Sequence, residues 1–200
     1  HDGFPAGVTG GLSACMSGVQ YYHTDAGGYF SFRWIKRSRE VLQRWSEANA
    51  FSPVLRTHEG NRPWAGVQPW QDEQALGHFA RMTRLHAALA PYLRHVSAQA
   101  QQSGIAMIRP FCLVEPGRKW RDKQDAYALG DDLLVYPVMK PRRRRMRIAI
   151  PQGEWLGMFD ERAYSGGTAV VECPPGQPVV LYRRASSFAG LFAGIGSSAS

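Results

Sequence analysis

One order of elements occurs twice in the first half of the chain: a short apolar run, a polar loop and an amphipathic helical pattern. The first unit covers residues 19–50, and the second covers residues 54–102. Strands that alternate with helices in this way are typical of parallel βα architecture. The repeated order therefore predicts two consecutive βα units within residues 1–104.

Apolar residues at helical spacing predict the two helices. Over residues 38–50 they are Val41, Leu42, Trp45 and Ala48. Over residues 72–102 they are Leu76, Phe79, Met82, Leu85, Leu89, Leu93 and Val96. Because proline lacks a backbone donor, Pro91 predicts a kink in the longer helix, and Gly104 predicts its end.

After Gly104 the chain consists of short runs rich in β-branched and aromatic residues, separated by proline and glycine turns. The runs are 105–114, 133–138, 147–150, 155–159, 169–173 and 179–182. This pattern predicts an antiparallel β domain over residues 105–187. We expect the Ser-, Ala- and Gly-rich residues after Leu191 to fray, although Phe188, Leu191 and Phe192 could dock on the sheet first.

Composition limits the compartment and the partners. The chain has 200 residues, of which 44% are hydrophobic, and it contains no apolar run long enough to span a bilayer. This composition predicts a globular protein with no membrane partner. The first residue is His1 rather than Met, so we expect a segment of a longer protein. The cysteines Cys15, Cys112 and Cys173 are odd in number and widely spaced, which favours free thiols and a cytoplasmic location. No motif indicates a metal or an organic cofactor.

A basic run, Arg142-Arg143-Arg144-Arg145, supplies much of the formal net charge of +8. Such a run can bind nucleic acid, but no aromatic residues are interleaved with it here. We interpret it as a solvated loop between strands, and we predict no nucleic-acid partner.

Polar residues follow both predicted parallel strands. After the first strand they are His23, Thr24, Asp25 and Tyr29, and after the second they are Arg56, Thr57, His58, Glu59 and Asn61. Because the carboxyl ends of parallel strands meet at one face of a βα barrel, we expect both sets to line one pocket. Taken singly, His58, Tyr29 and Asp25 also suit a structural hydrogen bonder, a packed aromatic and a turn carboxylate. We expect Arg56 and Glu59 to form an ion pair, and His23 only to pack.

Several motifs resemble the last barrel segments of glycoside hydrolase family 31. They are Tyr22-His23-Thr24-Asp25-Ala26-Gly27-Gly28-Tyr29, Arg44-Trp45-x-Glu47, Ala50-Phe51-x-Pro53-Val54 and Arg56-Thr57-His58-Glu59-Gly60-Asn61-Arg62-Pro63. The resemblance continues through residues 78–83, 131–138 and 151–155, and it is strongest to the sulfoquinovosidases. The chain departs from that group at Ala26, where a larger apolar residue is common, and in its more basic hairpin at 142–145.

The resemblance implies a fold and a reaction. The fold is a mixed α/β part, residues 1–104, formed by the last βα units of a (β/α)8 barrel, followed by a C-terminal antiparallel β-sandwich domain, residues 105–187, and the tail 188–200. The reaction is hydrolysis of α-glycosides of sulfoquinovose with retention, by two aspartates about 5 Å apart. Both aspartates lie upstream of His1 in the family, so no residue of this chain is predicted to be catalytic. We interpret Asp2 as an acid at a helix start.

The resemblance also implies roles for three residues. His58 matches a histidine that hydrogen-bonds sugar hydroxyls, since imidazole both donates and accepts. Tyr29 matches a tyrosine that helps to hold the sulfonate through water, where α-glucosidases of the family usually have phenylalanine. Asp25 matches an aspartate that orders an arginine or nearby amides, and an upstream arginine would bind the sulfonate. Two alternatives stay open: an α-glucosidase or α-xylosidase specificity, and a non-catalytic remnant that binds carbohydrate.

Overall fold

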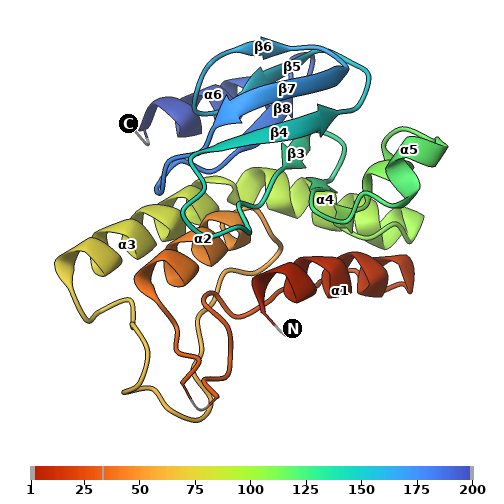
Figure 1. The fold of residues 1–200 in the computed structure, drawn as a ribbon. Helices are drawn as coiled ribbons and strands as arrows, with labels where there is room; N and C mark the ends of the chain where they lie inside the picture. The colour runs from red at the N-terminus through yellow and green to blue at the C-terminus, as the bar shows by residue number, and fades with distance from the viewer. Residues whose placement is uncertain (1–2, 33, 199–200) are drawn as a thin grey trace.

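The computed structural model describes residues 3–32 and 34–198, which form a helical half and a β half (Figure 1). The helical half contains α1 (Phe4–Met16), α2 (Arg39–Asn49), α3 (Glu73–Ala88) and α4 (Ala90–Ser103). The β half contains β1 (Ile108–Arg109), η1 (Phe111–Leu113), α5 (Arg118–Arg121), β2 (Tyr127–Leu129), β3 (Leu133–Val135), β4 (Arg145–Ile150), β5 (Trp155–Gly157), β6 (Ala163–Tyr164), β7 (Gly167–Glu172), β8 (Val180–Arg183) and α6 (Ala189–Ser198). Asp2, interpreted above as a helix-opening acid, lies outside the described residues.

Both predicted helices are present, but the longer one is divided. The predicted helix over 38–50 is confirmed as α2, and the side chain of Ser38 caps it by accepting from the Val41 amide. The predicted helix over 72–102 is interrupted only at Leu89, between α3 and α4, so the expected kink appears as an interruption two residues before Pro91. Pro91 lies in the first turn of α4, where its missing N–H costs nothing. Gly104 adopts φ 74° and ends α4 as predicted.

The two predicted parallel strands are reduced to one bridge. Asp25 pairs with Arg56 in a parallel bridge, and the Ala26 amide donates to the Arg56 carbonyl over 2.9 Å. Other partners take up the backbone groups near the first segment, since Nδ2 of the Asn49 side chain donates to the Thr24 carbonyl and the backbone amide of Met107 donates to the Gln20 carbonyl. The order and the parallel direction are therefore as predicted, without a regular ladder.

The β half is antiparallel throughout, as predicted. A six-stranded sheet has the order β1-β2-β3-β8-β5-β6, and β4 and β7 form a two-stranded sheet. The predicted strand over 105–114 is wrong beyond Arg109, because Pro110 leads into the 3-10 helix η1. Strands β2 and β6 were not predicted.

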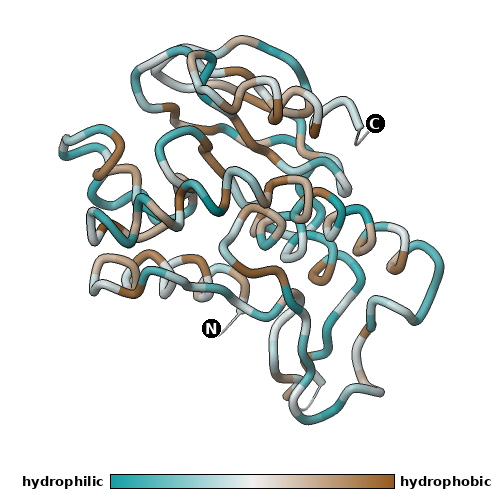
Figure 2. Tube along the Cα trace, turned by 180° about the vertical axis from the view of Figure 1, so that it is seen from behind, coloured by the Kyte–Doolittle hydropathy of each residue, from teal (hydrophilic) through white to brown (hydrophobic). Residues whose placement is uncertain are grey.

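The six-stranded sheet contributes side chains to two hydrophobic cores, one on each face, and Figure 2 shows brown, hydrophobic segments running through the interior of the β half. Successive residues of a strand point to opposite faces, so Leu133 packs toward the helices while Leu134 packs toward β4 and β7. The core on the helical side includes Met82, Leu89, Val135 and Phe192, and the core between the sheets includes Ile148, Trp155, Val171 and Leu181. The sheet therefore joins two hydrophobic cores.

The tail does not fray over the residues described. Phe192 and Ile195 of α6 are buried, and the Phe192 ring lies 5.0 Å from that of Tyr92. The apolar side of α6 thus docks on the helical side of the sheet, and the expected fraying is wrong as far as Ser198. Within residues 3–32 and 34–198, no helix combines the length and the apolar character that crossing a bilayer requires.

The basic run connects β3 to β4 and is tied down through its backbone. The Arg142 amide donates to Glu40, and the carbonyl oxygens of Arg143 and Arg144 accept from Arg44 and Cys173. The side chains of Arg142, Arg144 and Arg145 are exposed, and that of Arg145 forms an ion pair with Glu172. The backbone of the run therefore contacts the rest of the protein, and most of its side chains face solvent.

Candidate functional site

The glycine-rich turn after the first segment and the polar loop after the second lie side by side, at the end of the molecule away from the β half (Figure 1). The bridge between Asp25 and Arg56 begins the contact. The Gly60 amide extends it by donating to the Tyr29 carbonyl over 2.7 Å. The two sets of polar residues singled out in the sequence therefore converge in space.

Tyr29 and His58 form a stacked pair on these loops. Their ring centroids are 5.0 Å apart and the ring planes differ by 3°. Tyr29 is 52% exposed, and His58 is exposed as well. Gly60 makes room for the pair, because a Cβ at that position would lie 2.3 Å from Cζ of Tyr29. The result is a flat, solvent-facing surface that carries a phenol and an imidazole.

Asp25, the third predicted site residue, is bound to an arginine. Its Oδ1 lies 2.8 Å from Nε of Arg56, and the Asp25 side chain is only 15% exposed. The expected ion pair between Arg56 and Glu59 is wrong, because Glu59 pairs with Arg37 instead, over 3.4 Å. Both carboxylates of the two loops are thus engaged with arginines, and a substrate-binding role for Asp25 stays a prediction.

Arg37 is a central residue of the site that the sequence did not reveal. Its Nη2 donates to the carbonyl oxygens of Gly28 over 2.8 Å and His58 over 2.7 Å, and its Nη1 donates to Gln68 and Thr57. Burial lowers the pKa of Arg37, and the nearby carboxylates oppose this shift. The guanidinium stays charged, since an arginine keeps its proton in proteins.

Two glycines provide the space that Arg37 occupies. Gly27 has φ 85°, and a Cβ there would lie 2.7 Å from Cδ of Arg37. A Cβ at Gly66 would lie 2.9 Å from Cβ of Arg37. In the sequence, Arg37 lies between Lys36 and Ser38 in a basic stretch, which is typical of exposed residues. The glycines were the available signal, because a glycine often marks a close approach of another group.

A polar brace holds the chain just after Tyr29. Asn61 both accepts from the Ser31 amide over 3.1 Å and donates to the Ser31 carbonyl over 2.8 Å. The Ser31 hydroxyl also donates to Glu59 over 3.2 Å. Asn61 and Glu59, which the sequence placed with the site, therefore support the loops in this structure.

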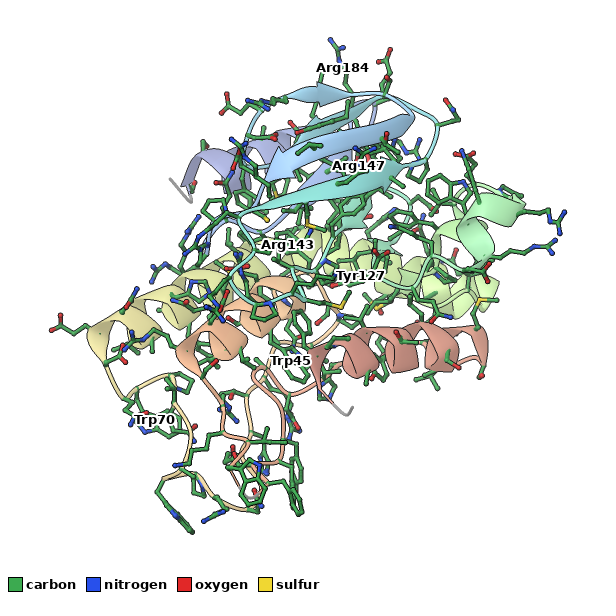
Figure 3. The ribbon with its side chains drawn as sticks, in the orientation of Figure 1. Trp45, Trp70, Tyr127, Arg143, Arg147 and Arg184 are labelled. Carbon is green, nitrogen blue, oxygen red and sulfur yellow. The ribbon has the colours of Figure 1, made fainter. Side chains whose placement is uncertain are left out.

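The base of the turn is anchored on α2. Trp45 donates from Nε1 to the Thr24 hydroxyl over 2.6 Å, and its ring stacks on Phe4 of α1 at 5.1 Å (Figure 3). His23 has no role beyond packing in the described structure, where its Nδ1 is buried without a hydrogen-bond partner. Helix α2 therefore anchors the site, and the two loops form its exposed part.

A cleft of about 490 Å³ opens beside Tyr29. It lies between the start of α1, the turn at 27–31, the start of α2 and the connection at 138–141, and it is mainly apolar with Lys36 and Lys140 among its lining residues. Tyr29 lines this cleft, whereas His58 and Asp25 do not. The three predicted residues therefore share one end of the molecule but not one cavity. No cluster of His, Cys, Asp or Glu in the described ranges could hold a metal ion.

Two family models match consecutive parts of the chain. The model of the glycosyl hydrolases family 31 TIM-barrel domain matches residues 2–96, and that of the glycosyl hydrolase family 31 C-terminal domain matches residues 104–187. The predicted fold class, the last βα units of a (β/α)8 barrel followed by an antiparallel β domain, is confirmed by these matches and by the arrangement of the strands.

Known relatives agree with this assignment. The chain is 43% identical over 195 residues to a sulfoquinovosidase of Agrobacterium fabrum, and 39% identical over 197 residues to one of Escherichia coli. These alignments cover 96% and 98% of this chain but 29% of each relative. A solved structure of a family 31 sulfoquinovosidase from E. rectale, in complex with the aza-sugar inhibitor IFGSQ, superimposes with a TM-score of 0.95 at 35% identity, covering 99% of this chain and 30% of the other. The chain thus spans under a third of the length of these proteins, and it belongs to glycoside hydrolase family 31.

Proposed function

We propose that this chain is the C-terminal part of a retaining α-glycosidase that hydrolyses α-sulfoquinovosides. The stacked pair of Tyr29 and His58 is the observation that carries the proposal. A phenol can donate a hydrogen bond to a sulfonate or to water bound there, which a phenylalanine ring cannot do. The identity to sulfoquinovosidases over nearly the whole chain supports the same substrate class.

The two residues of the pair take different parts of the substrate in this proposal. His58 binds ring hydroxyls, because a neutral imidazole donates from one nitrogen and accepts at the other. Tyr29 faces the sulfonate end of the sugar. Since the two rings lie face to face at 5.0 Å, the pair sets the spacing between the two recognition groups.

Catalysis itself is assigned to carboxylates outside this chain. Asp25 and Glu59 form ion pairs with Arg56 and Arg37, so both are committed to holding the loops. A retaining glycosidase needs one carboxylate as nucleophile and one carboxylic acid as proton donor, about 5 Å apart. We therefore expect the isolated 200 residues to show no turnover above a heat-killed control.

The test is Tyr29→Phe in the full-length enzyme, assayed on the 4-nitrophenyl glycosides of α-sulfoquinovose and α-glucose. We expect kcat/KM for the sulfoquinovoside to fall by about 10-fold or more, since one hydrogen bond to a charged group is worth roughly 1.5–3 kcal/mol. Activity on the glucoside should stay unchanged. Equal losses on both substrates would favour an α-glucosidase or α-xylosidase, and a full-length protein without turnover would favour a carbohydrate-binding remnant.

We further propose a cytoplasmic location. All three cysteines are free, and Cys15 and Cys173 are buried. Secreted proteins usually pair their cysteines. Fractionation of the source cells would test this, and recovery of the enzyme outside the cytoplasm would refute it.

A further inference from the structure

We propose that Arg37 is a positioning residue of the proposed sulfoquinovoside site, which fixes the turn that carries Tyr29 against the loop that carries His58. The inference rests on the proposed function for its substrate and on the geometry of one guanidinium for its mechanism. Arg37 acts through the backbone of the two loops.

A single nitrogen atom of Arg37 joins the two loops. Nη2 donates to the carbonyl oxygen of Gly28, the residue before Tyr29, and to the carbonyl oxygen of His58 itself. The two distances, 2.8 Å and 2.7 Å, are short for N–H···O bonds and typical of charge-assisted ones. These two hydrogen bonds therefore fix the spacing between the two backbones next to the stacked rings.

Burial makes this link rigid. The Arg37 side chain is 1% exposed, and its partner Glu59 is 3% exposed. Nη1 is held separately by Gln68 over 3.2 Å and by Thr57 over 3.4 Å. Because a guanidinium is planar, fixing Nη1 also fixes the direction of Nη2. Both terminal nitrogens of the guanidinium are therefore held in place by hydrogen bonds.

The surrounding residues are shaped for this side chain. Glycines at 27 and 66 leave room for its stem, and Ala26 contributes its carbonyl to Thr57, which in turn accepts from Arg37. Glu59 provides the opposite charge that a buried cation needs. A solvated basic residue would need neither the two glycines nor the buried carboxylate. Their convergence on Arg37 next to the loops of Tyr29 and His58 therefore supports a positioning role.

A lysine at position 37 cannot make this set of hydrogen bonds. Its ammonium is one point charge with tetrahedral donors, whereas Arg37 binds two carbonyls at one end and two side chains at the other. Arg37→Lys keeps the charge opposite Glu59, so it avoids leaving a buried carboxylate unpaired. It loses the geometry and preserves the electrostatics, which makes it the informative variant.

The first experiment is a double-mutant cycle of Arg37→Lys and His58→Ala in the full-length enzyme, with kcat/KM measured on the α-sulfoquinovoside and on the α-glucoside. We expect Arg37→Lys alone to lose about 10- to 100-fold, because small misplacements of binding groups have effects of this size. In the His58→Ala background the further loss should shrink to under about 3-fold, since Arg37 then has less left to position. Equal fold losses in both backgrounds would overturn the proposal.

Arg39→Lys is the matched control. Arg39 lies two residues away on the surface, where it pairs with Asp72 and its side chain is 46% exposed. We expect this variant to keep its activity in both backgrounds. Should Arg37→Lys fail to fold, Gln68→Leu removes one acceptor of Nη1 and leaves the arginine in place. It should give a smaller loss with the same non-additivity, and multiplicative losses would count against positioning.

The second experiment needs no substrate. The His58 ring lies over the Tyr29 ring, so its Cε1 proton should resonate upfield of an exposed histidine in enzyme labelled with [¹³Cε1]histidine. The signal is assigned by its absence in His58→Gln. In Arg37→Lys we expect it to move downfield, as in Tyr29→Leu, and an unmoved signal would refute the proposal. If the wild-type enzyme does not cleave sulfoquinovosides, the proposed function fails, while this signal still decides the role of Arg37.

Discussion

Two buried arginines seven residues apart, Arg37 and Arg44, use the same chemistry for different purposes. The Arg37 side chain is 1% exposed and that of Arg44 is 3% exposed, and both donate to backbone carbonyls and pair with a buried glutamate. The carbonyls bound by Arg37 belong to two loops at one end of the helical half. Those bound by Arg44 belong to Arg143, Cys173 and Pro174, in the β half.

Arg44, Glu47 and Arg81 form a cluster, called the Arg44 cluster, that joins the two halves. Figure 3 shows Arg143 where the halves meet. Glu47 accepts from Arg44 over 3.0 Å and from the Gly176 amide over 2.6 Å. Arg81 of α3 donates to the Gly176 carbonyl. Arg44, in the middle of α2, thus links the two halves of the fold, and Arg37, just before α2, sets the spacing of the exposed rings. Substitutions at the first place should act on stability, and those at the second should act on the site.

The largest expected effect is at the junction. Arg44→Met leaves Glu47 buried without its main partner and leaves three carbonyls without a donor. The free energy of unfolding, measured by urea denaturation, should fall by about 3–5 kcal/mol. Arg39→Met, at an exposed ion pair, should change it by under about 0.5 kcal/mol. Similar values for the two variants would mean that the junction is held by apolar packing alone.

Acid should weaken the same junction through His78. Burial lowers the pKa of His78 to about 4, and Arg81 and Arg44 add to this, while its bond to the Gln43 carbonyl opposes it. The unfolded chain has the ordinary value near 6.5, so it binds the proton first as the pH falls. The contribution of His78 to stability should therefore be largest above pH 6.5 and decline toward pH 4, by up to about 3 kcal/mol.

Glu47 opposes this decline, because burial raises its pKa and acid then favours the folded state. The contribution of His78 is isolated by His78→Gln, which keeps a donor for the Gln43 carbonyl. The difference in unfolding free energy between wild type and variant should change between pH 6.5 and pH 4. A difference that is constant over this range would contradict the prediction.

A neutral link across the junction should matter less than the charged one. The Tyr127 hydroxyl of β2 donates to the carbonyls of Ala48 over 2.9 Å and Phe51 over 3.2 Å. Tyr127→Phe should lower the free energy of unfolding by about 1–1.5 kcal/mol. Tyr21→Phe removes an exposed hydroxyl that binds Ser97 and serves as the control. A cost as large as that of Arg44→Met would mean that charge is not what distinguishes the cluster.

The smallest expected effect on stability is at the site. A Cβ at Gly60 would meet the Tyr29 ring at 2.3 Å, and an exposed ring can swing away at low cost. Gly60→Ala should therefore change the free energy of unfolding by under about 1 kcal/mol. The displaced ring should still lower kcat/KM of the full-length enzyme by about 10-fold. Unchanged kinetics would show that the Tyr29 position is not used.

The sequence predicted what depends on local spacing. Leu42 and Trp45 gave helix α2 its buried face, and the convergence of Asp25 with Arg56 followed from strand direction. Strand β2 was missed because Ala126 and Ala128 on either side of Tyr127 have weak β propensity, and pairing with β1 and β3 makes the segment a strand.

Arg37 was missed because its burial depends on Gly27 and Gly66, which are distant in sequence. The expected pair of Arg56 and Glu59 failed for the same reason, since tertiary partners displaced a local one. Local patterns therefore located the site, and the contacts that hold it together required the folded chain.

The exposed crossing from α4 to β1 has a practical consequence. Ser103, Gly104 and Ile105 are all exposed, yet Met82 and Leu89 before them share a core with Leu133 and Phe192 after them. A single protease cut at this crossing would leave two pieces that still adhere through that core and the Arg44 cluster. The chain is thus suited to being split at Gly104 into two separately expressed polypeptides whose reassociation reports directly on the strength of the junction.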